Sequence, residues 1–130
     1  MTQLHIPYGK TTLTARIPDS YNVTHLIPAQ TDPAPDPIAA VEHALDHPQG
    51  GRGLDAFADA KTVAIAVNDK TRPVPHQHLL PPLLDRLEGM GIAPENITLV
   101  IATGTHPVMP PSEYPWILPQ AIIDRYPIVC

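Results

Sequence analysis

Two short polar motifs, each following an apolar run, carry the side chains best suited to chemistry in this sequence. The first, residues 68–75, contains Asp69 and Arg72, and the second, residues 103–107, contains His106. An arginine guanidinium can hold a carboxylate through two parallel hydrogen bonds. A histidine can accept and donate protons near neutral pH, because its unperturbed pKa is about 6.5. A carboxylate, a guanidinium and an imidazole at one place would suit a small hydroxy acid.

The elements around these motifs predict that they meet. Thr62–Val67 and Ile97–Ala102 are near-continuous apolar runs, typical of strands that are covered on both faces. Gln77–Met90 has helical spacing, with leucines 80, 83, 84 and 87 on one stripe. Pro81 and Pro82 fit best in a first turn, so the regular helix is expected to begin near residue 80. Neighbouring parallel strands would place both motifs beyond their carboxyl ends, where open α/β sheets bind ligands.

The rest of the chain predicts an α/β protein with a Rossmann-like parallel sheet, βαβ units and an N-terminal β-hairpin. A helix should begin at Asp36, an N-cap candidate that is followed by proline. The last apolar run resembles an interrupted strand. We therefore expect residues 1–130 to be the N-terminal α/β portion of a larger domain, truncated near residue 130. The remaining expected elements are a hairpin of 3–6 and 12–17, a linker over 27–37, helices over 54–60 and 118–126, a loop at 110–111 and a strand from 128.

Asp69 can serve the expected site in two ways, by orienting His106 or by fixing Arg72. Thr71, Thr103 and Gly104 are expected to contact the substrate, and the glycine permits a tight turn and a close approach of the ligand. Taken alone, either motif could also be a solvated turn without chemistry.

Other candidate functional residues are weaker, and we expect them at the surface or packed in loops. They are His43 with His47, which have the i, i+4 spacing of helical metal ligands, His76 with His78, and Tyr114 with Trp116.

Composition excludes several classes of protein. The formal net charge is −5 and no Lys/Arg cluster is present, so nucleic-acid binding is not expected. Cys130 is the only cysteine, which excludes a disulfide framework within the chain. No secretory signal and no apolar run approaching ~20 residues is visible, so we expect no membrane span and a cytoplasmic location.

At these motifs the chain resembles the N-terminal part of the lactate racemase family, whose members carry a nickel-pincer nucleotide. The element D-x-T-R-P-x-P with a downstream T-G-x-H is the most specific part of the resemblance. Further matching segments extend it over nearly the whole chain: Ile6–Lys10, Asp46–Gly50 leading to Leu54, Asp69–Pro75 and Ala102–His106.

The resemblance implies an enzyme that racemises or epimerises 2-hydroxy acids. The nickel cofactor takes a hydride from the substrate α-carbon, a histidine takes the hydroxyl proton, and the hydride returns to the other face. By motif position, His106 matches one of two catalytic histidines. Arg72 matches the arginine that binds the substrate carboxylate, and Asp69 matches the neighbouring acid.

Two features of the sequence depart from the family. Pro107 stands where arginine is common, and the loop of residues 108–116 is rich in proline. The lysine that bonds the cofactor, the second histidine and the nickel ligand lie farther along in family members. We therefore expect that the isolated chain neither holds the cofactor nor turns over substrate, and that a downstream domain or partner chain completes the site.

Two other interpretations stay open from the sequence. One is a truncated, non-catalytic α/β module that binds a carboxylate or a partner chain. The other is a nucleotide-binding domain of a different enzyme, which the absence of a phosphate-binding loop disfavours.

Overall fold

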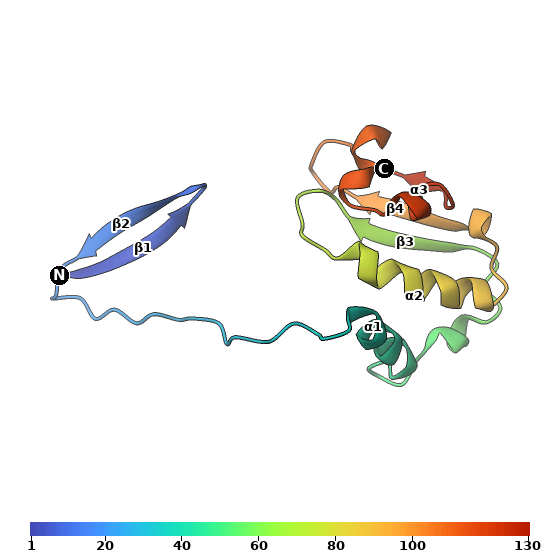
Figure 1. Cartoon of the computed structure of the whole chain (residues 1–130), viewed down its shortest axis with the longest axis horizontal. Helices are drawn as coiled ribbons and strands as arrows, with labels where there is room; N and C mark the ends of the chain where they lie inside the picture. Colours follow the sequence, from blue (N-terminus) through green and yellow to red (C-terminus); the bar gives the residue numbers. More distant parts are fainter. The chain divides into compact units, whose positions relative to one another are not determined.

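The N-terminal segment of the chain forms a separate β-hairpin. The computed structural model describes residues 1–130, which divide into two compact units, Met1–Asp32 and Pro33–Cys130. In the first unit, β1 (Thr2–Tyr8) pairs antiparallel with β2 (Thr11–Ile17) (Figure 1). Gly9 at the turn has φ 58°, a left-handed conformation that glycine adopts without steric cost. The expected hairpin is therefore confirmed, with strands that reach closer to the turn.

The second unit is built on a three-stranded parallel sheet. β3 (Val63–Asn68), β4 (Ile97–Ala102) and β5 (Ile128–Val129) lie side by side in that order. α2 (His76–Gly89) forms the crossover from β3 to β4 and lies along the sheet (Figure 1). The crossover from β4 to β5 contains η3 (Pro111–Trp116) and α3 (Gln120–Ile123). This arrangement confirms the predicted α/β class with a parallel sheet and an N-terminal hairpin.

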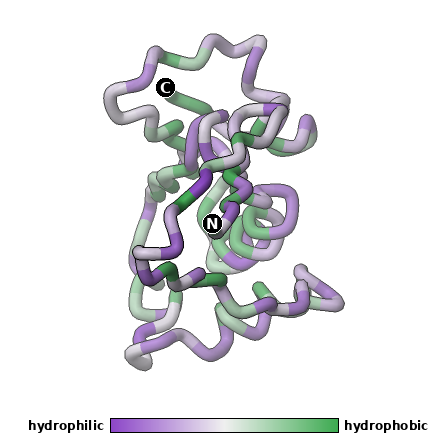
Figure 2. Tube along the Cα trace, turned by 90° about the vertical axis from the view of Figure 1, so that its left-hand side faces the viewer, coloured by the Kyte–Doolittle hydropathy of each residue, from purple (hydrophilic) through white to green (hydrophobic).

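The core of this unit lies between α2, the sheet and the second crossover. Apolar and hydrophilic stretches alternate along the chain, as expected when each element buries one side (Figure 2). No helix has the length and apolar character that crossing a membrane requires. The buried apolar residues of the core are Val67, Leu80, Leu84, Leu87, Ile92, Ile97, Leu99, Ile101, Met109, Leu118, Ile122 and Tyr126.

The expectation that β3 is covered on both faces was wrong. Ile65 and Val67 are directed inward, whereas Ala64 and Ala66 on the opposite face are exposed. β3 is also an edge strand, since only β4 pairs with it. A run of small and branched apolar residues has the same pattern whether one or both of its faces are covered, which explains the error.

The expected start of α2 near Leu80 was also wrong. The helix begins at His76, where Pro75 O accepts the N–H groups of His78 and Leu79. Pro81 consequently lies in the second turn, where the helix forgoes a backbone hydrogen bond. His76 was expected at the surface but is 4% exposed, and its Nδ1 lies 3.0 Å from Ile117 O. Packing of this first turn against the second crossover outweighs the local preference of the prolines.

The first helix of the second unit follows local rules more closely. α1 (Pro37–Asp46) begins where expected, and the Asp36 carboxylate accepts the Ala39 N–H at 3.0 Å. η1 (Leu54–Phe57) and η2 (Pro94–Asn96) are single 3₁₀ turns. The second crossover differs from prediction, since η3 forms where a loop was expected and α3 is shorter than residues 118–126.

Candidate active site

The two polar motifs begin at the same level of the parallel sheet. Asn68 and Ala102 are the last residues of β3 and β4, and they are register partners. Asp69 and Thr103 therefore leave the sheet side by side, at the carboxyl ends of adjacent strands. This is the edge at which open α/β sheets bind ligands.

The Asp69 carboxylate is buried and engaged on both oxygens. Oδ1 accepts the Thr71 hydroxyl at 2.6 Å and the Thr71 backbone N–H at 3.1 Å. Oδ2 lies 2.6 Å from His106 Nδ1. The Thr71 hydroxyl first, and then His106, lower the pKa of Asp69 to about 2, against the opposing effect of burial. Asp69 is therefore an anion at neutral pH, and an anionic carboxylate only accepts hydrogen bonds.

His106 is held by this carboxylate while its ring stays accessible. Because Asp69 can only accept, Nδ1 carries the proton and donates it, which leaves the Nε2 lone pair free. The His106 side chain is 46% exposed, compared with 5% for Asp69. The backbone turns sharply just before it: Gly104 has φ 61°, and the His106 N–H donates to Thr103 O at 3.0 Å. The turn aims the imidazole back toward β3.

Arg72 lies on the loop that follows β3, three residues after Asp69, and its guanidinium is available. Its backbone N–H donates to Asp69 O at 3.2 Å, which closes a turn. Its side chain is exposed and takes part in none of the ion pairs of the structure. Of the two roles considered for Asp69, the structure therefore shows contact with His106 and none with the Arg72 side chain. Thr103 is half-buried, and Gly104 is exposed beside it.

The arrangement suits proton transfer next to a bound anion. A carboxylate that accepts from Nδ1 fixes the imidazole and stabilises the imidazolium that forms when Nε2 takes a proton. A free arginine nearby can hold a carboxylate bidentately. The chain offers no cluster of three or more histidine, cysteine or acidic side chains able to hold a metal ion.

Sequence reasoning missed the residues that tie the two loops together. The Lys70 N–H donates to Met109 Sδ at 3.4 Å, and Lys70 Nζ lies 2.5 Å from Glu113 Oε2. Met109 is 1% exposed and anchors the loop that follows His106. One signal was available, since an apolar Met109 between prolines is typical of a loop that is pinned into a core. Nothing local pairs Lys70 with a residue 43 positions later.

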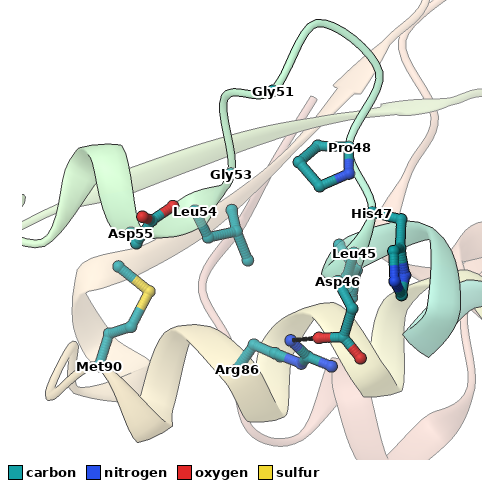
Figure 3. Close-up of a pocket in the computed structure, with 10 residues that line it drawn as sticks. All are labelled: Leu45, Asp46, His47, Pro48, Gly51, Gly53, Leu54, Asp55, Arg86 and Met90. Carbon is teal, nitrogen blue, oxygen red and sulfur yellow. Dashed lines mark hydrogen bonds and ion pairs between the residues drawn. The ribbon is translucent and has the colours of Figure 1, made fainter.

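The second unit also has a hollow that lies away from this sheet edge. It is bounded by α1, α2 and the connection between them, with the Asp46–Arg86 ion pair on its wall (Figure 3). None of the expected site residues lines it. His47 is at its edge, where its ring stacks on His43 with centroids 4.2 Å apart and its Nδ1 contacts His43 O. Both histidines are exposed at the surface.

Comparison with known proteins places the chain in a family. Residues 8–130 match the lactate racemase N-terminal domain. The chain is 35% identical to a lactate racemase of Lactiplantibacillus plantarum over 111 residues, which is 82% of this chain and 26% of that protein. It is 32% identical to a lactate racemase of Thermoanaerobacterium thermosaccharolyticum over 110 residues, or 82% and 25% of the two chains. The chain therefore spans about a quarter of the length of these relatives. It belongs to the lactate racemase family, as an N-terminal domain.

Proposed function

We propose that residues 1–130 are the N-terminal α/β portion of a racemase or epimerase that acts on a small 2-hydroxy acid. In this proposal the chain supplies the substrate-carboxylate site and one acid/base histidine. The observation that carries the proposal is the 2.6 Å contact between His106 Nδ1 and Asp69 Oδ2 at the shared sheet edge, inside the range that matches the family. Inversion of a hydroxy acid needs a group that removes and returns the hydroxyl proton, and His106 is suited to that task.

Each residue of the site has a distinct part in this proposal. Arg72 binds the substrate carboxylate through its free guanidinium, which orients the hydroxyl group toward His106. His106 Nε2 accepts the hydroxyl proton as the α-carbon is oxidised, and it returns the proton when the α-carbon is reduced on its other face. Asp69 keeps Nδ1 protonated and stabilises the imidazolium between the two steps. Thr71 holds Asp69 and, together with Thr103 and Gly104, borders the substrate.

In this proposal the nickel-pincer nucleotide would accept the hydride from the α-carbon and return it, and the residues that bind this nucleotide lie outside the chain. The chain spans about a quarter of the length of its relatives, so the remaining length can supply those residues. We therefore place the cofactor on a downstream domain or a partner chain, and we assign it no contact with the residues described above. The isolated chain is expected to bind a hydroxy acid weakly and to leave its configuration unchanged.

The direct test is to produce the chain together with its native downstream sequence and to incubate it with one enantiomer of lactate. Chiral chromatography follows the appearance of the other enantiomer, and elemental analysis measures bound nickel. Interconversion by protein that contains nickel supports the proposal. Saturable binding of lactate by nickel-loaded protein without interconversion would instead favour the non-catalytic carboxylate-binding module, for which the unpaired Arg72 is the supporting observation.

A further inference from the structure

A second set of contacts joins the two loops directly beside the Asp69–His106 pair. Lys70 Nζ lies 2.5 Å from Glu113 Oε2 and 5.0 Å from the centre of the Trp116 ring. The Glu113 side chain is only 18% exposed, and that of Lys70 is 41% exposed. The ammonium group is thus held between a carboxylate and an aromatic face, where a cation is favoured. We call Lys70, Glu113 and Trp116 the clamp.

The loop that carries His106 has few other means of being held. Three of the five residues in 107–111 are prolines, which have no backbone N–H to donate. The Met109 N–H is used, since it donates to Cys130 Sγ at 3.1 Å. Fixation of this loop relative to β3 therefore relies on side chains, and the buried Met109 and the clamp are among them.

The position of Lys70 in the chain couples the clamp to the site. Lys70 lies between Asp69, which binds His106, and Thr71, which binds Asp69. Its own N–H is fixed by Met109 Sδ. A displacement of Lys70 is transmitted through one peptide bond to the Asp69 carboxylate. Glu113 and Trp116 belong to the crossover that also carries His106, whereas Lys70 is the neighbour of Asp69. The clamp therefore restrains both partners of the Asp69–His106 contact.

We propose that Lys70, Glu113 and Trp116 are positioning residues that hold His106 Nδ1 against Asp69. They touch neither the substrate nor the reacting atoms. The effect on turnover rests on the proposed function, whereas the effect on the His106–Asp69 contact does not. A test that observes this contact can therefore fail or succeed independently of the racemase activity.

The contact can be observed in the 130-residue chain by proton NMR with ¹⁵N-labelled histidine. An imidazole N–H in a short hydrogen bond to a carboxylate resonates far downfield, and it is observed while this bond shields the proton from exchange with water. We expect such a resonance from His106 Nδ1–H in the parent chain. Lys70→Met and Glu113→Gln should broaden or abolish it, and Lys70→Arg should preserve it, because a guanidinium can both pair with Glu113 and stack on Trp116.

Matched control variants distinguish the effect of losing the clamp from the effect of removing a charge anywhere on the surface. Lys61→Met and Glu95→Gln remove the same charges from exposed residues that form no ion pair, and they should leave the resonance intact. A resonance that persists in Lys70→Met and Glu113→Gln overturns the proposal. Its absence from the parent chain also overturns it, since His106 would then not be held.

Turnover by the protein with its downstream sequence provides a second measurement. Misplacement of a catalytic group by about 1 Å can cost on the order of 100-fold in rate. Lys70→Met should therefore lower kcat, by up to about 100-fold, with KM little changed, and Lys70→Arg should restore kcat. A change confined to KM would contradict a positioning role.

Discussion

Replacement of Met109 by alanine should weaken the second unit and release the loop behind His106. The Met109 side chain is 1% exposed and belongs to the buried core. Truncation of a buried methionine to alanine costs about 2–5 kcal/mol through lost transfer free energy and the cavity that remains. The change also removes the sulfur that accepts the Lys70 N–H. Against a typical unfolding free energy of about 5–15 kcal/mol, this is a large fraction of the stability.

Urea unfolding followed by circular dichroism measures the loss. With an m-value of about 1–3 kcal/mol/M, a loss of about 3 kcal/mol moves the midpoint by about 1–3 M. Met109→Leu is the matched control, because it conserves volume and should cost less than about 1.5 kcal/mol while removing the sulfur. The difference between the two variants isolates the packing contribution.

The reasoning would be refuted by Met109→Ala unfolding within about 1 kcal/mol of the parent chain at an unchanged m-value. Such a result would mean that the residue does not anchor the loop. Equal losses in Met109→Ala and Met109→Leu would place the stabilisation in the sulfur contacts instead of the core.

Three further predictions concern charged residues. The pKa of Asp69 is lowered to about 2, so its hydrogen bonds contribute fully to stability above the ordinary pKa of 3.8, and this contribution is lost as the pH falls through about 2. Urea midpoints should therefore decline more over that pH range in the parent chain than in Asp69→Asn. Arg72→Ala should raise KM for the hydroxy acid in the longer protein by roughly 10- to 100-fold, through loss of a charge-assisted hydrogen bond, and an unchanged KM argues against its role. The Glu88 carboxylate accepts a hydrogen bond from Arg125 Nε at 3.0 Å, and this guanidinium lowers the pKa of Glu88. Glu88→Gln should therefore lower the urea midpoint, whereas the control Glu95→Gln should leave it unchanged.

The sheet and the meeting of the two motifs could be predicted because both follow from local patterns. Apolar runs separated by a helical stripe require a βαβ unit, and adjacent parallel strands bring their carboxyl ends together. The hairpin turn and the Asp36 cap were visible for the same reason, since each depends on a few consecutive residues.

The remaining features depend on contacts between distant residues. His76 looks like a surface residue at a helix start until Ile117 O, 41 positions later, is placed beside it. The same packing lets α2 begin before its prolines. Lys70 pairs with Glu113 across the same kind of distance. Ala64 and Ala66 are exposed because no element covers that face of β3, and a run of apolar residues does not encode whether one or both faces are covered.

The central claim is that His106, oriented by Asp69, moves the hydroxyl proton of a 2-hydroxy acid. The most direct measurement compares kcat for lactate interconversion in the parent protein, His106→Ala and His43→Ala, each made with the native downstream sequence and matched for nickel content. His43 is an exposed histidine on α1, so its removal should leave kcat unchanged. We predict that His106→Ala lowers kcat by about 10²–10⁴-fold, as expected for loss of an acid/base group. A kcat for His106→Ala that equals that of His43→Ala would contradict the account.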